Sequence, residues 1–191
     1  MYVFSRNNYK RDYGHLKFFG VLSDMIINLV SGDLFTSSDS LVHCVSADMR
    51  MSKGIALQFK QRFQELSSIT TYIGVGEVLP VKTSDNRYIF NLITKERFYH
   101  KPNYSDVERC LKNLGLLTKL LGVNSLSMPR IASGLDRLDW DKVFNILHQS
   151  MQDIPNLRIT VYSPVSGSTR YSGGPSANIF PATSSLFSDR Q

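Results

Sequence analysis

Two charged residues of this 191-residue sequence have the types that covalent catalysis needs, a nucleophile and a group that moves protons. Lys95 ends the β-rich segment Tyr88–Lys95, and Asp136 lies two residues after Gly134 in a loop that follows a predicted strand. A lysine amine attacks only in its neutral form, and a neighbouring carboxylate can serve as general acid and base. The same pair also fits a surface lysine at a strand end and a carboxylate that stabilises a helix start, so the spacing alone leaves both interpretations open.

Three loops that follow predicted strands have the composition of a ligand site. They are the loops over 31–35, 46–55 and 129–136. Gly54 permits a close approach of the backbone, and the helix start behind it presents unpaired N–H groups that favour anions. Two glycine-bearing loops that each open a helix could hold a diphosphate from both sides, although a glycine before a helix is also an ordinary turn signal.

Strands and helices alternate along the chain and must position these loops. Strands are predicted over 25–30, 41–46, 75–82, 87–95, 125–128 and 157–162, and helices over 55–66, 107–121 and 140–151. Ser105 and Glu108 fit a capping box, Gly122 fits a helix end, and Asp139 fits an N-cap. The alternation predicts an α/β fold in which helices cover a mostly parallel or mixed sheet and ligands bind beyond the carboxyl ends of strands.

Composition divides the chain into one folded domain and two extensions. Hydrophobic residues make up 42% and charged residues 20%, which supplies a core and excludes a fully disordered chain. We expect residues 25–163 to form the domain, residues 1–24 a weakly ordered basic extension, and residues 164–191, rich in Ser, Gly and Pro, a disordered tail. No apolar stretch approaches the ~18 residues of a membrane-spanning helix, and no secretory signal pattern opens the chain.

Cysteines, histidines and net charge narrow the possible partners. Cys44 and Cys110 lie in apolar surroundings and are expected to be small buried residues without a disulfide. No pair among the 4 histidines has a metal-binding spacing, so neither a metal nor another cofactor is expected. The formal net charge of +6 suits an anionic partner, such as a phosphate ligand, an acidic protein or RNA, and it equally suits a solvated surface.

Several runs, in collinear order over residues 27–163, resemble one known family. They are GDLF (32–35), SLVHCVS (40–46), YIFNLITKER (88–97), HKP (100–102), LSMPRI (126–131), GLDRL (134–138) and ITVY (159–162). The sequence resembles the macrodomains, and most of all the terminal ADP-ribose protein glycohydrolases. That resemblance implies a three-layer α/β/α fold with a mixed central sheet, and ADP-ribose as the ligand.

The resemblance also implies a role for each candidate residue. Asp33 and Leu34 would hold the adenine, with Tyr162 and Pro164 closing that end of the site. One side of the diphosphate and the distal ribose would lie against Ser46, Met51, Ser52, Lys53, Gly54 and Ile55. The other side of the diphosphate would lie against Arg130, Ile131, Ala132, Ser133, Gly134 and Leu135. Lys95 and Asp136 match the catalytic lysine and aspartate of the family.

The activity implied by the resemblance is removal of ADP-ribose joined through an ester to Glu or Asp side chains, together with deacylation of O-acetyl-ADP-ribose. Acyl migration would expose an aldehyde-like sugar carbon, Lys95 would attack it, and Asp136 would move protons while the lysyl adduct is hydrolysed. The alternatives are a reader module that binds ADP-ribose without cleaving it and a phosphatase acting on ADP-ribose 1″-phosphate. A reader needs neither Lys95 nor Asp136, so their presence favours the enzyme.

The expected partners are ADP-ribose and ADP-ribosylated proteins. The basic extensions would add contacts to poly(ADP-ribose) or RNA through their positive charge. We expect a monomer, located in the nucleus, the cytoplasm or both.

Two departures from the family pattern lie in the predicted diphosphate loops. Met51-Ser52-Lys53-Gly54 stands where the family usually has Met-Gly-Ala-Gly, and Ala132-Ser133 stands where it usually has Gly-Cys. Loss of a glycine restricts the backbone beside the diphosphate, and Ala132 would crowd the ligand if that position needs a positive φ. Lys53 could contact a phosphate or point into solvent. We expect the departures to change affinity more than catalysis, because both catalytic residue types are present.

Overall fold

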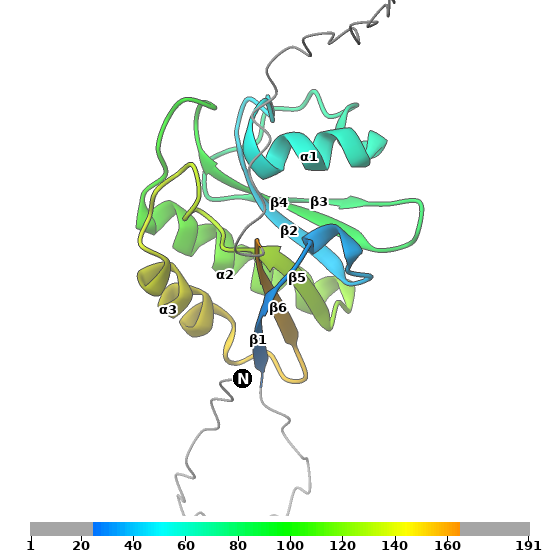
Figure 1. Cartoon of the computed structure of the whole chain (residues 1–191), viewed down its shortest axis with the longest axis vertical. Helices are drawn as coiled ribbons and strands as arrows, with labels where there is room; N and C mark the ends of the chain where they lie inside the picture. Colours follow the sequence, from blue (N-terminus) through cyan, green and yellow to red (C-terminus); the bar gives the residue numbers. More distant parts are fainter. Residues whose placement is uncertain (1–24, 165–191) are drawn as a thin grey trace, which may run out of the picture.

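The computed structural model describes residues 25–164, which form a six-stranded mixed sheet flanked by helices (Figure 1). The strand order is β1-β6-β5-β2-β4-β3, and all neighbours are parallel except β3 and β4. The elements are β1 (Ile26–Ser31), η1 (Leu34–Thr36), β2 (Ser40–Ser46), α1 (Gly54–Arg62), η2 (Gln64–Leu66), β3 (Val78–Lys82), β4 (Tyr88–Lys95), α2 (Tyr104–Leu121), β5 (Ser125–Pro129), α3 (Trp140–Met151) and β6 (Arg158–Ser163). The expectations for residues 1–24 and 165–191 lie outside the described residues.

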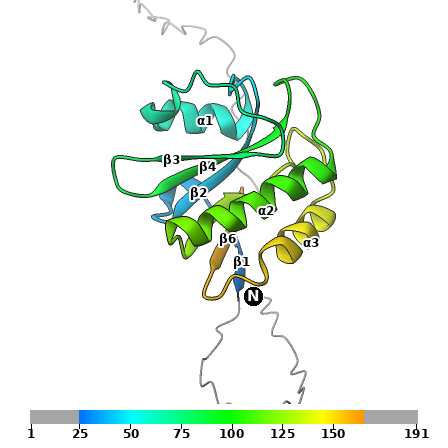
Figure 2. The ribbon, with the colours of Figure 1, turned by 180° about the vertical axis from the view of Figure 1, so that it is seen from behind.

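Two apolar clusters, one on each face of the sheet, give the structure three layers (Figures 1 and 2). One cluster joins α2 and α3 to the sheet, and the other joins α1 and η1 to the opposite face. Residues of β2 alternate between them, because Val42 belongs to the first cluster while Leu41 and Val45 belong to the second. The predicted three-layer α/β/α fold is confirmed. Its central strands are mostly apolar because both faces are covered, and the few polar residues in them, such as His43 and Asn91, are buried.

Two predicted helix ends are confirmed and one is wrong. Asp139 caps α3 by accepting a hydrogen bond at 2.9 Å from the backbone N–H two residues further on. Gly122 ends α2 in the left-handed conformation, at a φ of 66°. The helix predicted over 55–66 instead ends at Arg62, because Phe63 is extended and starts a separate 3-10 turn.

The predicted capping box at Ser105 and Glu108 is also wrong. Asn103 caps α2, and its side-chain oxygen accepts a hydrogen bond from the backbone N–H of Asp106 at 2.8 Å. Asparagine is among the most favourable N-cap residues, so the cap lies two residues before the predicted one, the helix begins at Tyr104, and Ser105 falls in its first turn. Glu108 pairs with Lys112 along the exposed side of the helix at 2.6 Å.

The carboxyl ends of the parallel strands gather at one edge of the sheet. In β2, β4, β5 and β6 these ends are Ser46, Lys95, Pro129 and Ser163. The connections over 47–53, 96–103 and 130–139 leave from that edge, as Figure 1 shows. The fold therefore brings the candidate loops to the place where sheets of this kind bind ligands.

Both cysteines are free, and they differ in burial. Cys110 is buried as predicted, whereas Cys44 is only partly buried. Cys44 lies near the carboxyl end of β2, where the backbone N–H of Ala132 reaches its sulfur. Among residues 25–164, no helix has the length and hydropathy to cross a membrane.

Candidate active site

Lys95 and Asp136 meet at the carboxyl edge of the sheet. The distance from Lys95 Nζ to Asp136 Oδ1 is 2.5 Å, and the two side chains are 15% and 13% exposed. The alternative interpretation of the sequence required a lysine on the surface, and neither of the two groups lies free there. The structure thus brings the amine and the carboxylate into proton-transfer distance, in a place that is shielded on most sides.

Strand pairing fixes the backbone of Lys95. The register between β2 and β4 shifts between Val45 and Ser46, and this shift places Ser46 opposite Lys95. The backbone N–H of Ala47 then donates to the carbonyl oxygen of Lys95 at 2.9 Å. The amine is therefore carried by the last residue of a rigid central strand, which limits how far its origin can move.

The turn that carries Asp136 contains a strained alanine. Ala132 has a φ of 55°, and its carbonyl oxygen accepts a hydrogen bond from the N–H of Leu138 at 3.0 Å, which closes the turn. The backbone therefore does need a positive φ at this position, where the family usually has glycine. An alanine in the left-handed region costs about 1 kcal/mol relative to an allowed conformation. The departure at Ala132 is thus a cost within the loop itself.

Cys44 lies beneath this turn but offers no competing nucleophile. Burial, and to a smaller extent the negative charge of Asp136, raises the pKa of the Cys44 thiol, so it stays protonated. Within residues 25–164, no three His, Cys, Asp or Glu side chains gather in a way that could hold a metal ion. The protonated, partly buried thiol of Cys44 is not suited to nucleophilic attack.

The loop over 46–55 is shaped by backbone conformation and touches the second loop. Met51 is buried with a φ of 45°, and Gly54 opens α1 with a φ of 60°. A Cβ atom on Gly54 would lie 2.9 Å from Cδ1 of Leu135. Only glycine fits this position without a shift, and the contact brings together the two loops predicted to hold the diphosphate.

Asp48 links the first loop to the segment that follows Lys95. The hydroxyl of Ser46 donates to Asp48 Oδ1 at 2.5 Å, and the backbone N–H of Phe98 donates to Asp48 Oδ2 at 3.3 Å. Burial alone would raise the pKa of Asp48, but these hydrogen bonds and one from the backbone of Arg50 outweigh it and hold the pKa below its ordinary value. The Ser46 hydroxyl is thus engaged by Asp48, which keeps its negative charge at neutral pH.

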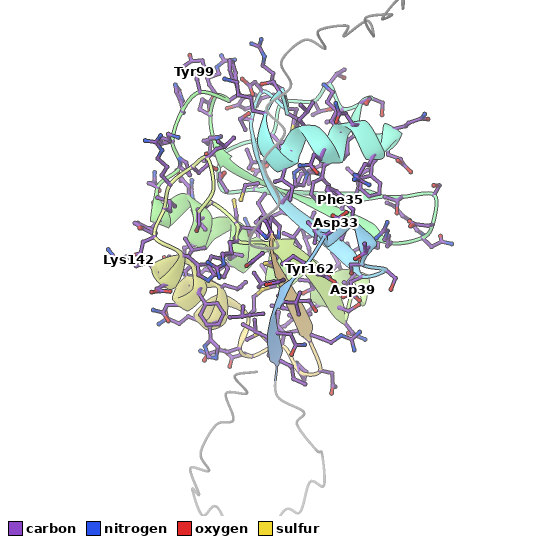
Figure 3. The ribbon with its side chains drawn as sticks, in the orientation of Figure 1. Asp33, Phe35, Asp39, Tyr99, Lys142 and Tyr162 are labelled. Carbon is purple, nitrogen blue, oxygen red and sulfur yellow. The ribbon has the colours of Figure 1, made fainter. Side chains whose placement is uncertain are left out.

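The end of the site predicted to hold adenine is formed by the starts of two loops. Asp33 accepts a hydrogen bond from the N–H of Phe35 at 3.0 Å and so caps η1 over the buried Leu34. The ring of Tyr162 lies beside Gly32, with 3.8 Å between its edge and a Cβ placed there. Figure 3 shows Asp33, Phe35 and Tyr162 at the same part of the molecule, where β1 and β6 end.

The other predicted ligand residues fall into three groups by exposure. The exposed ones are Ser52, Lys53, Arg130, Leu135, Gly134 and Pro164. Ile55 and Ser133 are half-buried, and Ile131 is buried. A ligand at this edge of the sheet would therefore meet the first group through side chains or open backbone, and Ile131 through the shape it gives the loop.

Sequence reasoning missed an aromatic rim beside Lys95, formed by Arg50, Arg97, Phe98 and Tyr99. The Arg50 guanidinium lies 4.3 Å from the centre of the Phe98 ring, and the Phe98 and Tyr99 rings meet edge to face at 5.2 Å. Tyr99 is 68% exposed and stands out at the molecular surface in Figure 3. The basic and aromatic residues directly after Lys95 are the signal that could have revealed the rim.

A second lysine also escaped sequence reasoning. Lys101 donates a hydrogen bond from Nζ to the carbonyl oxygen of Leu135 at 2.5 Å, directly before Asp136. It belongs to the HKP run (100–102), which carried part of the family resemblance without a stated role.

Known proteins provide an independent identification. The profile of the Macro domain matches residues 42–147. The chain belongs to the macro domain family. Over 139 residues this macrodomain is 42% identical to the ADP-ribose glycohydrolase OARD1 of Bos taurus, covering 72% of this chain and 91% of the relative. Over 160 residues it is 29% identical to the DNA ADP-ribosyl glycohydrolase of Mycobacterium bovis, covering 78% of this chain and 45% of the relative.

Solved structures agree with this assignment. The macrodomain of Thermus aquaticus DarG matches with a TM-score of 0.68 at 27% identity, covering 73% of this chain and 99% of that one. The macrodomain of Mycobacterium tuberculosis DarG matches with a TM-score of 0.68 at 28% identity, covering 73% and 98%. The family and the fold inferred from the sequence motifs are thus confirmed.

Proposed function

We propose that this macrodomain is a hydrolase that removes ADP-ribose from ester-linked mono-ADP-ribosylated proteins and deacylates O-acetyl-ADP-ribose. The observation that carries the proposal is the 2.5 Å contact between Lys95 Nζ and Asp136 Oδ1, beside the point where two candidate ligand loops touch. A module that only binds ADP-ribose has no use for a shielded amine–carboxylate pair. The names of the relatives, ADP-ribose glycohydrolase and DNA ADP-ribosyl glycohydrolase, support the same class of reaction.

In the first half of the proposed reaction, Asp136 takes a proton from the Lys95 ammonium group and leaves a neutral amine. The Nζ lone pair bonds to the anomeric carbon of the distal ribose, and the bond from that carbon to the ester oxygen breaks with its electron pair. The departing oxygen takes the proton from Asp136, so the acceptor leaves as a carboxylic acid and then ionises. The lysyl adduct of ADP-ribose that remains then opens its ribose ring. A proton passes from Nζ to the ring oxygen, the bond from that oxygen to the anomeric carbon breaks, and a protonated Schiff base joins this carbon to Nζ.

Water completes the reaction. Asp136, again a carboxylate, takes a proton from a water molecule as its oxygen bonds to the anomeric carbon. The hydroxyl proton of the resulting carbinolamine passes to Nζ as the carbon–nitrogen bond breaks toward nitrogen, which releases ADP-ribose in its aldehyde form and a neutral Lys95. Proton transfer from Asp136 back to Lys95 restores the ion pair seen in the structure. Deacylation of O-acetyl-ADP-ribose follows the same steps, with acetate as the leaving group, once the acetyl group has migrated to the anomeric oxygen.

Turnover of a glutamate-linked mono-ADP-ribosylated peptide tests the proposal. We expect the wild type to release ADP-ribose, and Lys95→Met and Asp136→Asn each to lose at least about 100-fold in kcat. Lys119→Met, which changes an exposed lysine in the last turn of α2, is the control and should keep full activity.

Two other outcomes would replace this proposal. A reader would bind ADP-ribose in calorimetry yet release none from the peptide. A phosphatase would release phosphate from ADP-ribose 1″-phosphate and leave the ester intact. Either result would show that the Lys95–Asp136 pair does not carry out ester cleavage.

The aromatic rim favours a second candidate, an enzyme whose acceptor is single-stranded nucleic acid. Exposed rings stack on bases and arginines neutralise phosphates, and Tyr99, Arg50 and Arg97 offer both beside Lys95. The Mycobacterium bovis relative carries the name DNA ADP-ribosyl glycohydrolase. Under this alternative, Tyr99→Ala would lower kcat/KM about tenfold on an ADP-ribosylated single-stranded oligonucleotide and leave the peptide substrate unaffected. Equal turnover of the oligonucleotide by both proteins would exclude it.

A further inference from the structure

The loop that carries Asp136 is held by two lysines from one short segment. Lys95 contacts the carboxylate of Asp136 at 2.5 Å, and Lys101 donates to the carbonyl oxygen of the preceding residue, Leu135, at 2.5 Å. One contact therefore reaches the reacting group itself, and the other reaches only the backbone beside it. Because the Lys101 contact takes no part in the chemistry, it can hold the loop while Lys95 reacts.

The contact between Lys95 and Asp136 cannot hold the loop throughout the proposed reaction. When Nζ bonds to the anomeric carbon, Lys95 becomes part of the adduct and its ion pair with Asp136 is lost. Asp136 must still stand beside that carbon to take a proton from water. The loop then needs a restraint that does not involve the reacting atoms.

Lys101 is well placed to supply that restraint because the start of α2 follows it closely. Pro102 is buried, and Asn103 caps the start of α2. On the other side, the N–H of His100 bonds to the carbonyl of Arg97 at 2.9 Å. The ammonium group of Lys101 thus extends from the fixed start of a long helix to the loop.

The other polar contacts of the loop, among the described residues, do not substitute for Lys101. The hydrogen bonds within 130–138 close the turn without attaching it to another element. The backbone N–H of Ala132 bonds to Cys44, four residues before Asp136. The backbone N–H of Asp139 also donates to the Tyr104 hydroxyl at 3.1 Å, three residues beyond Asp136 and directly before α3. Lys101 is therefore the side chain whose bond to the loop lies nearest to Asp136 when Lys95 is occupied.

We propose that Lys101 is a positioning residue, which holds Asp136 beside the anomeric carbon through the Leu135 carbonyl while Lys95 is bound to the sugar. The assignment rests on the proposed hydrolase function. It requires a donor of lysine-like length at position 101, and it does not require Lys101 to touch the substrate.

Kinetics with matched variants test the first part. Lys101→Met keeps the length of the side chain and removes the donor, and we expect kcat on the glutamate-linked peptide to fall about tenfold with ADP-ribose affinity changed less than about threefold. Lys101→Arg keeps a donor and should recover most of the activity. Lys119→Met, on the exposed end of α2, should behave as wild type. An unchanged kcat in Lys101→Met would overturn the proposal, as would a loss that appears only in affinity.

Hydrogen exchange tests the second part without any need for turnover. The amides over 130–138 are followed in the wild type, Lys95→Met, Lys101→Met and the double variant, with thermal unfolding as a check on folding. We expect Lys95→Met to keep most of the protection in this loop and the double variant to lose at least about tenfold more. Equal exchange in Lys95→Met and the double variant would contradict the role of Lys101. If the wild type itself fails to cleave the ester, the hydrolase function fails, and the exchange result still reports on the loop.

Discussion

The two sides of the sheet hold their loops in different ways. On one side α1 buries a single residue, Phe59, and opens with a loop whose shape depends on left-handed backbone at Met49, Met51 and Gly54. On the other side α2 buries six residues, and the loop before α3 is fixed by side-chain bonds from Lys95 and Lys101. Weak anchoring suits a loop that closes on a ligand, whereas strong anchoring suits a loop that must hold a reacting carboxylate.

This comparison makes a general prediction. Changes on the α1 side should alter ADP-ribose affinity first, and changes to the bonds of the second loop should alter kcat first. Variants on the two sides should therefore separate an effect on ADP-ribose affinity from an effect on kcat.

The largest effect is expected for Phe59→Ala. Phe59 is fully buried, stacks on His43 with 3.9 Å between ring centres, and contacts Phe35 at 5.0 Å. We expect the free energy of unfolding from urea titration to fall by about 4 kcal/mol, because a cavity replaces the anchor of α1. ADP-ribose affinity should weaken with it. Leu147→Ala, in the opposite layer, should lose stability at nearly constant affinity, and a comparable loss of affinity there would break the comparison.

Acid should weaken the α1 side through His43. Burial, partly offset by the hydrogen bond to Asn91, lowers the pKa of His43 from 6.5 to about 4. Between these two pH values the unfolded chain binds a proton at His43 that the folded chain does not bind. The contribution of His43 to the free energy of unfolding is therefore fully present above pH 6.5 and is lost as the pH falls toward 4. The expected loss across that window is about 3 kcal/mol in urea titrations.

A His43→Gln variant isolates this contribution. It keeps a donor for Asn91 and removes the titrating group, so it should show a smaller change in stability over the same pH range. If the free energy of unfolding falls equally with pH in the variant and in the wild type, the acid sensitivity belongs to other groups.

Gly54→Ala should weaken ligand binding more than it lowers stability. The added Cβ would meet Leu135 Cδ1 at 2.9 Å at a backbone φ of 60°, which an alanine tolerates poorly. We expect a destabilisation of about 1–2 kcal/mol and an ADP-ribose affinity at least about tenfold weaker by calorimetry. Adding Leu135→Ala relieves the clash and should recover part of the affinity, while wild-type affinity in Gly54→Ala would show that the two loops do not act on the ligand together.

The smallest effect is expected for Ala132→Gly. Ala132 has a φ of 55°, so glycine should raise the free energy of unfolding by up to about 1 kcal/mol, read as a rise of a few degrees in Tm. Because Asp136 is held mainly by Lys95 and Lys101, kcat should change less than about twofold. A large change in kcat would mean that the strained alanine itself positions the carboxylate.

Periodic apolar segments made the layers of the fold predictable from the sequence. The exact ends of the helices were harder to predict, because neighbouring residues compete to cap or end a helix. The apolar residues that recur at helical spacing in α2 and α3 include all the buried hydrophobic residues of the two helices, whereas Leu116 and Leu120 of α2 lie exposed. At the start of α2, Asn103 rather than Ser105 is the cap, and its side-chain oxygen accepts the N–H of Asp106. At Phe63 an extended backbone ends a pattern that continues in the sequence.

The candidate site shows the same limit. Lys95 and Asp136 could be singled out because strand ends and glycine turns meet at one edge of a parallel sheet. The bond from Lys101 to Leu135 joins a side chain to a carbonyl oxygen 34 residues away, and such contacts leave no periodic signal in a sequence. The aromatic rim likewise depends on Arg50 crossing from another loop to reach Phe98.

Reductive trapping tests the central claim most directly. Borohydride added while the enzyme turns over a glutamate-linked mono-ADP-ribosylated peptide should leave ADP-ribose joined covalently to Lys95, identified by mass spectrometry of the digested protein. Lys95→Arg should give no such adduct, although it still binds ADP-ribose. Turnover by the wild type without any trapped adduct, or an adduct of equal yield on another residue in Lys95→Arg, would contradict a reaction that passes through Lys95.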